Sequence, residues 1–291
     1  MKALLLSLIE SQVVSAFVNR RYTPVAKRQK KYLRERSTMS ERCETVAQFY
    51  DELSPYYHLV YTDWQREIRT EAEVLDRVLR SGCPGARRVL DVACGIGTQA
   101  LGLAQLGYEL TASDISGESV DRARKEAAQR GLKIAFSVCD MRQASQHHRT
   151  PFDAVIACDN AVPHLLTDLE ILSAFRECHA CTRPGGVFVI SVRDYDKEQR
   201  SGVQLKPHGV RQIDGVRYIV LQVWEFSGSI YETSMYVVED TGASVKSRVM
   251  RTSYYAIGIG QLLDLMRQAG FQDIQRINGD LLQPILMGKR R

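Results

Sequence analysis

Val89-Leu90-Asp91-Val92-Ala93-Cys94-Gly95-Ile96-Gly97-Thr98-Gln99-Ala100 is the stretch that decides the fold of this 291-residue chain. The apolar run from Arg88 to Ala93 is typical of a buried parallel strand. Gly95 and Gly97 then indicate a tight turn that a ligand can approach closely, because glycine enters positive φ freely. From Thr98 onward the pattern is that of a helix, whose N-terminal amides would face the ligand.

Two aspartates indicate which kind of ligand the turn binds. Asp91 comes at the carboxyl end of the strand, beside the crevice where open α/β sheets bind their ligands. A carboxylate there would repel a pyrophosphate but attract the ammonium and sulfonium of S-adenosylmethionine. The run from Leu110 to Asp114 is typical of the next strand, and its final carboxylate can accept both hydroxyls of a ribose. The alternative, a Rossmann-like turn without a ligand, leaves these two spaced acids unexplained.

Residues 91–98 (Asp-Val-Ala-Cys-Gly-Ile-Gly-Thr), with Asp114 and Cys139-Asp140-Met141, resemble the class I S-adenosylmethionine-dependent methyltransferases. The resemblance implies an α/β fold with a Rossmann-like seven-stranded methyltransferase sheet and S-adenosyl-L-methionine as methyl donor. It implies that the glycines line the methionine moiety, that Asp114 holds the ribose, and that Asp140 and Met141 flank the adenine. The candidate cofactor-binding residues are Asp91, Ala93, Gly95, Gly97, Asp114, Ile115, Asp140 and Met141.

The rest of the chain alternates strand and helix patterns and then changes. Such alternation implies right-handed crossovers in a parallel sheet. After the fifth strand, strand-like runs separated by turn residues indicate an antiparallel β insert. The expected helices are 64–79, 119–130, 169–178 and 260–269; the expected sheet strands are 88–93, 110–114, 133–139, 152–158, 187–191, 271–277 and 284–288, with insert strands at 216–226, 231–239 and 245–255.

We expect four segments along the chain. Residues 1–38 are a basic N-terminal extension, 39–200 the cofactor-binding α/β domain with an N-terminal helical lid, 201–256 the antiparallel β insert, and 257–291 the helix and strands that complete the sheet. The extension contains nine Lys or Arg and two Glu, hence +7; because the whole chain carries +5, residues 39–291 carry −2. Nucleic acid is therefore an improbable partner of the body. The extension is an appendage or upstream extension, a targeting presequence, or a basic arm for anionic surfaces.

Membrane and metal signals are weak. The apolar run 3–18 is too short to span a bilayer, so we expect no transmembrane segment. The seven cysteines are odd in number and lie mostly in strand or helix contexts, as buried thiols do in a reducing cytosol, which predicts a cytoplasmic protein. Cys178 and Cys181 form a single C-x-x-C pair at a helix end, which favours structural cysteines over a metal site. We expect no metal.

Three further stretches point into the ligand crevice. Residues 159–165 place the amide of Asn160 near the donor methyl, and residues 190–196 place Arg193, whose planar fork binds carboxylates, just after the fifth strand. Residues 253–255 return from the insert towards the same crevice. An ion pair with Asp194 or Asp196 is the alternative for Arg193, and His164 is a structural loop histidine rather than a base.

These stretches, with the early tyrosines, are similar to the glycine/sarcosine N-methyltransferase family over about residues 44–291. The family shows Gly-Asn-Ser-x-x-His-Leu, Arg-Asn-Tyr-Asp and Ser-Tyr-Tyr at matching places, and the same insert. The resemblance implies that Arg193 grips the acceptor's carboxylate and that Asn160 orients near its amine. Asp159, where the family has glycine, and Val162 depart from the pattern. The implied catalytic residues are Asn160 and Tyr254, and the implied substrate-binding residues are Arg193, Tyr50, Tyr57 and Tyr255.

Three functions fit these observations. The first is N-methylation of glycine, sarcosine or a related small amino acid, which Arg193 favours. The second is methylation of another acceptor, a different small molecule or RNA reached through the basic arm. The third is a non-catalytic cofactor-binding sensor, against which Asn160 argues. Methyl transfer to an amine depends mainly on alignment and desolvation, and the amine must arrive neutral, with water or a tyrosine taking its proton. A homo-oligomer is possible.

Overall fold

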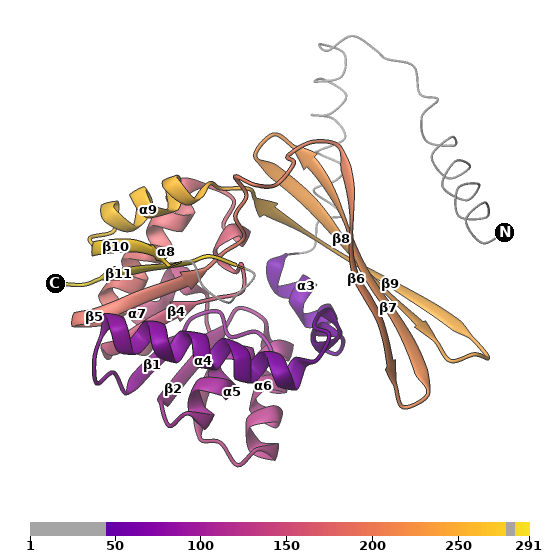
Figure 1. Cartoon of the computed structure of the whole chain (residues 1–291), viewed down its shortest axis with the longest axis horizontal. Helices are drawn as coiled ribbons and strands as arrows, with labels where there is room; N and C mark the ends of the chain where they lie inside the picture. The colour runs from indigo at the N-terminus through magenta and orange to yellow at the C-terminus, as the bar shows by residue number, and fades with distance from the viewer. Residues whose placement is uncertain (1–44, 278–282) are drawn as a thin grey trace, which may run out of the picture. The chain divides into compact units, whose positions relative to one another are not determined.

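The computed structural model describes residues 45–277 and 283–291 of the chain. The basic extension expected at 1–38 lies outside these residues. The described part belongs to one compact unit, Glu44–Arg291, which contains two β-sheets and the helices around them (Figure 1).

The larger sheet has seven strands in the order β10-β11-β5-β4-β1-β2-β3 (Figure 1). Six strands run in the same direction, and β11 runs antiparallel to its neighbours β5 and β10. The expected seven-stranded Rossmann-like sheet is thus confirmed. Its strands are β1 (Arg88–Asp91), β2 (Glu109–Asp114), β3 (Ile134–Val138), β4 (Phe152–Ala157), β5 (Thr182–Ser191), β10 (Gln272–Ile277) and β11 (Ile285–Lys289). Only β5 differs much from expectation, because it begins at Thr182, five residues before the expected start at Val187.

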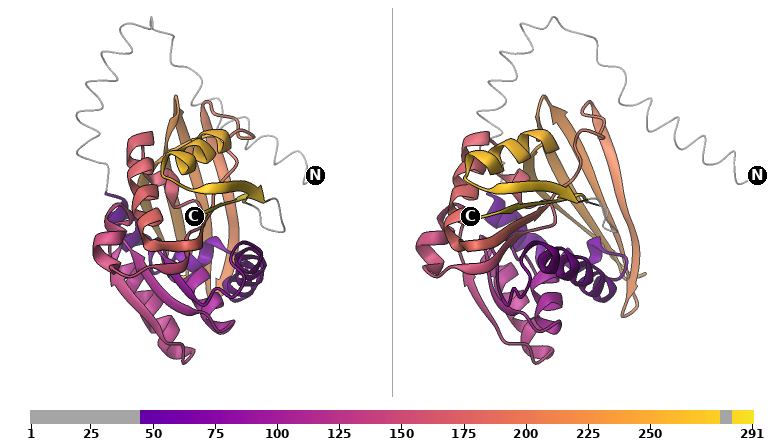
Figure 2. Two further views of the ribbon diagram at one scale, coloured as in Figure 1. Left: turned by 90° about the vertical axis from the view of Figure 1, so that its left-hand side faces the viewer. Right: turned by 60° about the vertical axis from the view of Figure 1, so that its left-hand side comes forward.

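Helices cover both faces of this sheet (Figures 1 and 2). Apolar residues of α4, α5 and α6 pack with one face and those of α7, α8 and α9 with the other, which makes two separate cores. Side-chain caps fix several helix starts: Asp63 accepts from the amide of Arg66, and Thr167 from that of Glu170. The helices are α4 (Trp64–Gly82), α5 (Thr98–Gln105), α6 (Gly117–Gln129), α7 (Ala144–His148), α8 (Asp168–Cys181) and α9 (Ile259–Gln268).

The two helices nearest the glycine turn pack unusually closely. A Cβ placed on Gly102 of α5 would lie 2.3 Å from the carbonyl oxygen of Ile68 and 2.6 Å from the Cβ of Ala72, both on α4. We expect Gly102→Ala to lower the free energy of unfolding by about 1–3 kcal/mol, because overpacking outweighs the better helix propensity of alanine. Gly260 is an exposed helical glycine of α9 with nothing within 4 Å of such a Cβ, so Gly260→Ala is the matched control. Denaturant unfolding measures both variants, and equal stabilities would show that the close contact between α4 and α5 is wrong.

The insert is a second, four-stranded antiparallel sheet in the order β6-β7-β8-β9, standing beside the α/β part (Figure 2). Its strands are β6 (Val203–Ile213), β7 (Val216–Ser227), β8 (Ile230–Asp240) and β9 (Val245–Tyr255). The expectation of three strands was wrong because it missed β6. Pro207 and Gly209 interrupt the β6 pattern, and the register shifts there. The missed signal was Asp214-Gly215, both at positive φ, which is a typical two-residue hairpin turn.

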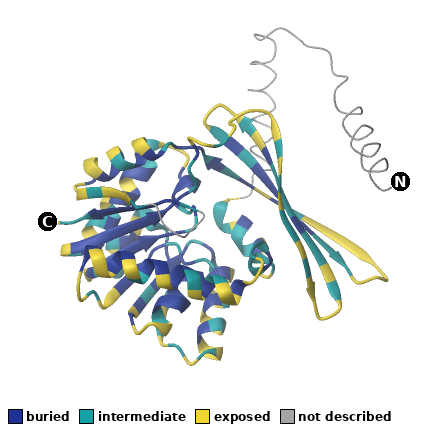
Figure 3. Cartoon of the chain, viewed as in Figure 1, coloured by how far each residue is buried: buried dark blue, intermediate teal, exposed yellow. Residues whose placement is uncertain are grey.

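A short N-terminal segment connects the two sheets. It consists of α3 (Val46–Leu53), started by a Thr45–Gln48 capping box, and the 3₁₀ turn η1 (Tyr57–Val60). Its apolar side chains form a core with the inner face of the second sheet, which is buried there and exposed towards the hairpin tips (Figure 3). The core residues are Phe49, Leu53, Leu59, Val220, Met235, Val237 and Met250.

Candidate active site

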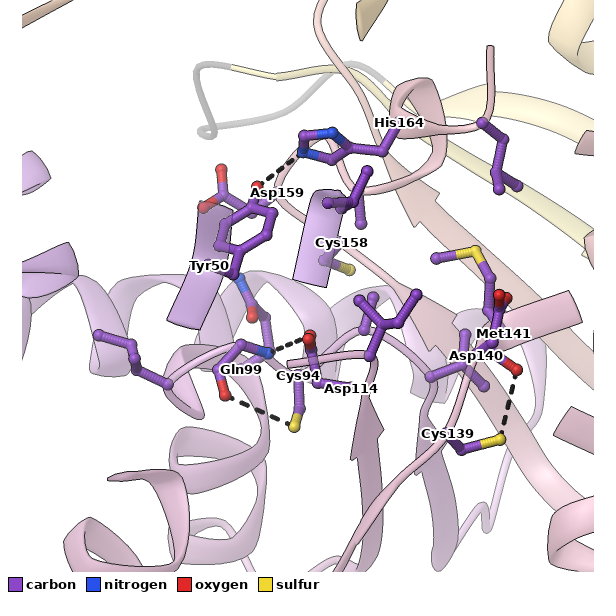
Figure 4. A pocket seen from close by; sticks show the side chains of 18 of the residues that line it. Tyr50, Cys94, Gln99, Asp114, Cys139, Asp140, Met141, Cys158, Asp159 and His164 are labelled. Atoms are coloured by element: carbon purple, nitrogen blue, oxygen red, sulfur yellow. Dashed lines mark hydrogen bonds between the residues drawn. The ribbon is translucent and has the colours of Figure 1, made fainter. Parts of the chain in front are cut away.

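A cavity of about 290 Å³ lies at the carboxyl ends of the parallel strands (Figure 4). Figure 4 shows Tyr50, Asp159 and His164 at one end and Cys139, Asp140 and Met141 at the other. Among the expected cofactor-binding residues, those that line it are Ala93, Gly95, Asp114, Ile115, Asp140 and Met141; Asp91 and Gly97 are not in its lining.

Gly97 shapes the cavity instead of lining it. It begins α5 at φ 95°, and a Cβ there would lie 3.2 Å from Leu101 and 3.3 Å from Ala123. Gly95, at φ 51°, does line the cavity. The two positive φ angles turn the chain sharply between β1 and α5, so that the amides of this loop can face a ligand.

Asp114 at the end of β2 organises the loop as well as the cavity. Its Oδ2 accepts from the amide of Gly95 at 2.8 Å, and its Oδ1 accepts from the amide of Ser116 at 2.9 Å. Burial raises the pKa of this carboxyl, and the amide donors oppose that shift. Each oxygen keeps a lone pair, so the carboxylate can still accept two ribose hydroxyls.

Asp91 provides a test of whether the site fits S-adenosylmethionine. Its Oδ1 accepts from the amide of Ala93 at 3.1 Å, whereas Oδ2 is buried and has no partner within the described residues. An unpaired buried carboxylate oxygen is costly unless a donor reaches it. The ammonium of the methionine moiety is such a donor, so the residues present fit the cofactor.

This fit predicts a pH dependence of cofactor affinity. Burial raises the pKa of Asp91 to about 7, although the amide of Ala93 opposes the shift. The free protein is therefore stabilised by protonated Asp91 at low pH, and this contribution is lost as the pH rises through about 7. The ammonium of the cofactor favours the ionised form, so the affinity should rise by about tenfold between pH 6 and pH 8.

Isothermal titration calorimetry at the two pH values measures this rise. In Asp91→Asn most of it should disappear, with the remainder due to Asp114, whose pKa is also raised. A wild-type affinity that does not change with pH would contradict pairing between Asp91 and the ammonium.

Asp140 forms a charged group with two side chains that sequence inspection missed. Arg142 donates to Asp140 at 2.6 Å and to Glu170 at 2.9 Å, and all three line the cavity. Burial alone would raise the pKa of Asp140, but the hydrogen bonds from Arg142 outweigh it and lower that pKa. Asp140 is thus ionised and able to accept a further donor.

A second cavity, of about 80 Å³, adjoins the first between η1 and the inner face of the second sheet. Tyr50, Tyr57 and Asp159 line both cavities. Tyr255 lines neither, because its hydroxyl donates to Asp168 at 3.0 Å. The expected acceptor residues found here are Asn160, Arg193, Tyr50, Tyr57 and Tyr254.

The guanidinium of Arg193 lies against the indole of Trp224, 4.6 Å from the ring centroid. It makes a long ion pair with Glu198, 3.4 Å, and its buried Nε has no partner within the described residues. The alternative partners are engaged elsewhere, Asp194 with Arg276 and Asp196 with Arg200. Arg193 therefore keeps donors for an anionic ligand.

Asn160 is held by two hydrogen bonds at the base of this cavity. Its Oδ1 accepts from the amide of Arg193 at 3.0 Å, and its Nδ2 donates to the hydroxyl of Tyr195 at 2.9 Å. Tyr195 in turn pairs with the hydroxyl of Tyr231 at 2.9 Å, and Tyr231 stacks on Tyr254. This network orients Asn160 and fixes one wall of the cavity.

His164 lines the larger cavity and is not in the lining of the second one. Its Nε2 lies 2.8 Å from the hydroxyl of Tyr50, and its ring lies 4.0 Å from that of Tyr254. Burial lowers the pKa of His164 to about 3, so the ring stays neutral at physiological pH and is a weak base. The hydroxyls of Tyr50 and Tyr57 also stay protonated, because burial raises their pKa values well above the usual one.

Several residues of this cavity could not be found from the sequence. Trp224 and Tyr231 are buried side chains of β7 and β8, and ordinary alternation along a strand does not say which face meets a ligand. Asp159 belongs to the stretch expected in the ligand crevice, but it was given no role there and was otherwise a departure from a family pattern. Its place just past β4 was the one signal that it faces the crevice.

Metal and membrane features of the described residues are few. Ligand atoms of Cys139, His147 and His148 lie within 4.8 Å of one another, so the absence of a metal stays a prediction. Cys178 and Cys181 are both buried free thiols. In the described ranges, no helix is both long and apolar enough to cross a membrane.

A family model described as a methyltransferase domain matches residues 89–186. The glycine/sarcosine N-methyltransferase of Parasynechococcus marenigrum (strain WH8102) is 28% identical over 215 residues, 73% of this chain and 72% of that protein. The glycine/sarcosine N-methyltransferase of Aphanothece halophytica is 24% identical, over 73% of this chain and 76% of its own. The ubiquinone biosynthesis O-methyltransferase of Methylocella silvestris is 34% identical over 122 residues, 42% of this chain and 45% of its own.

Solved structures share the fold. S-adenosylmethionine-bound CalS10, an amino pentose methyltransferase from Micromonospora echinaspora, matches 81% of this chain and 94% of its own with a TM-score of 0.69 and 19% identity.

Proposed function

We propose that this chain, a class I S-adenosylmethionine-dependent methyltransferase, transfers the methyl group to the amine of a small amino acid such as glycine or sarcosine. The observation that supports the proposal most is the placement of Arg193. Its guanidinium lines a cavity of about 80 Å³ directly beside the cofactor cavity, and its Nε is buried without a partner among the described residues. A small carboxylate would supply the missing acceptor.

The extent of the sequence match also supports an amino-acid acceptor. The two glycine/sarcosine N-methyltransferases described above match more than 210 residues each, far more than the 98 residues of the methyltransferase-domain model. Their similarity therefore extends beyond the cofactor-binding half. The O-methyltransferase relative matches 122 residues, fewer than half of the chain.

When bound, S-adenosylmethionine supplies a methyl group on a positively charged sulfur, which is ready for displacement. The protein's own residues bind and align the acceptor. Arg193 holds its carboxylate, Asn160 orients the end near the donor, and the tyrosines shared by the two cavities exclude water. Alignment and desolvation of this kind supply most of the rate of an in-line transfer.

Incubation of the purified chain with methyl-labelled cofactor and a panel of acceptors tests the proposal. The panel contains glycine, sarcosine, an amino sugar, a catechol and a structured RNA. Label should appear in glycine or sarcosine. Label confined to the catechol or the RNA would support the second class of acceptor, and no label in any acceptor at saturating cofactor would support a sensor.

A further inference from the structure

Asp159 lies where the two cavities meet. Among the described residues it is the only acidic side chain that lines both. It follows Cys158 just past β4, at the edge of the sheet where the donor and acceptor must meet. Any acceptor atom that reaches the cofactor therefore passes close to this carboxylate.

The backbone at this position disfavours a side chain. Asp159 and Asn160 have φ angles of 54° and 63°, in the left-handed region that glycine adopts most easily. Ser191 fixes the bend, because its Oγ accepts from the amide of Asp159 at 2.8 Å and its carbonyl oxygen accepts from that of Asn160 at 3.0 Å. Strained residues of this kind are concentrated at functional sites. An aspartate in place of glycine thus points to a use of its carboxylate.

The carboxylate is surrounded by neutral donors and lacks a cation. Its Oδ2 accepts from Tyr61 at 2.7 Å and from Tyr57 at 3.5 Å, and its Oδ1 accepts from Gln283 at 3.1 Å. Within the described ranges no Lys, Arg or His lies within ion-pair distance of it. Arg193 lines the same acceptor cavity but pairs with Glu198 instead. A cationic ligand would therefore meet an uncompensated negative charge.

We propose that Asp159 binds the ammonium group of the acceptor and takes the proton that must leave before methyl transfer. This inference rests on the proposed function and adds a residue to it, because the carboxylate end of the acceptor faces Arg193 and the amine end faces Asp159. The same cavity then discriminates against acceptors that lack a positive charge.

The proton transfer makes the chemistry balance. The ammonium gives one proton to the Asp159 carboxylate, which becomes a neutral carboxylic acid, and the nitrogen keeps its electron pair. That pair forms the bond to the methyl carbon as the methyl–sulfur bond breaks, and the electrons of the broken bond stay on sulfur. The methylated amine leaves as a cation, and Asp159 then returns its proton to the solvent.

Other titratable groups near Asp159 constrain the interpretation of pH effects. Burial, followed by the charge of Asp159, raises the pKa of Glu71. The groups that face Asp159 or line its cavities are Tyr50, Tyr57, Tyr61, Glu67, Glu71, Cys94, Asp114, Cys139, Asp140, Arg142, Cys158, His164, Glu170, Arg193, His208, Tyr231 and Tyr254.

The decisive measurement is the pH profile of kcat/KM for sarcosine in wild type and Asp159→Asn. Below the pKa of the amine, the wild-type profile should be flat, because Asp159 accepts the proton of the bound ammonium. The variant should be slower by about 30-fold or more at pH 7 and should gain about tenfold per pH unit as the neutral amine becomes available. A constant ratio at every pH would overturn the inference while leaving the proposed function intact.

A binding measurement separates this role from folding and from turnover. With S-adenosylhomocysteine present, sarcosine should bind Asp159→Asn about tenfold or more weakly than wild type, whereas acetate, which has a carboxylate but no amine, should bind both alike. If sarcosine and acetate lose affinity equally in Asp159→Asn, the role of Asp159 is to maintain the structure of the cavity. If wild type neither binds nor methylates any amine, the proposed function and this inference fail together.

Backbone strain supplies the matched control. Asp159→Gly should unfold at the same temperature as wild type or higher, because glycine relieves the positive φ, yet at pH 7 it should be as slow as Asp159→Asn. Asp214 is an exposed hairpin residue at φ 49°, so Asp214→Gly tests the same relief of strain away from the cavities. Full activity in Asp159→Gly would overturn the inference.

Discussion

Asp114→Ala is expected to lower the affinity for S-adenosylmethionine by at least tenfold. The substitution removes an acceptor of two ribose hydrogen bonds, each worth ~1.5–3 kcal/mol when the acceptor is charged. It also deprives the amides of Gly95 and Ser116 of their acceptor, so the glycine turn should lose part of its preorganised shape. Titration calorimetry measures the affinity, and a melting curve measures the structural part of the effect.

Two further variants make this prediction decisive. Asp114→Asn keeps an acceptor at nearly the same place and should fall between wild type and alanine. Asp121 is an exposed acid of α6 that pairs with Arg124, so Asp121→Ala should leave the affinity unchanged. An unchanged dissociation constant in Asp114→Ala would mean that the ribose is held elsewhere.

Arg193→Lys is expected to remove most of the activity on glycine or sarcosine while the cofactor still binds. Lysine keeps the charge but lacks the planar fork, so it cannot pair with a carboxylate bidentately. Removing one partner of a buried, hydrogen-bonded charge pair costs ~2–5 kcal/mol, and this cost should lower kcat/KM for the acceptor. The substitution also weakens the contact of this side chain with Trp224, so part of the loss in kcat/KM comes from a side chain that is held less firmly in place.

The control for this variant is a surface arginine of β7, the strand that carries Trp224. Arg217 is exposed on β7 and pairs with Asp240, so Arg217→Lys should behave as wild type. An amine without a carboxylate should be a poor substrate of the wild type, and Arg193→Lys should change its rate little. If the variant loses affinity for both the cofactor and the acceptor, the role of Arg193 is structural. If it loses affinity for neither, another residue binds the carboxylate of the acceptor.

The sequence by itself determined the cofactor half of the protein. Its signals are local: a buried strand, two glycines and the start of a helix lie within twelve residues, and Asp114 ends the next strand. In a parallel sheet the carboxyl ends of neighbouring strands meet at one edge, so residues at these ends come together whatever the details of packing. The seven-stranded sheet and the cofactor followed from that rule.

The acceptor half depended on the tertiary structure. The sequence did not predict strand β6, because Pro207 and Gly209 interrupt its pattern. It predicted Tyr255 in the acceptor cavity, which its neighbour Tyr254 lines instead. Alternate residues of a strand face opposite sides, so a motif such as Ser-Tyr-Tyr cannot indicate which tyrosine points inward until the register is known.

Asp159 shows the same division between sequence and structure. The sequence revealed an aspartate where a related family has glycine, but not what the aspartate faces. Only the packing of η1 and the second sheet against the end of β4 places its carboxylate between two cavities, next to Tyr57 and Tyr61 and without a cation among the described residues. Contacts between segments a hundred residues apart arise from packing, and a local pattern does not encode them.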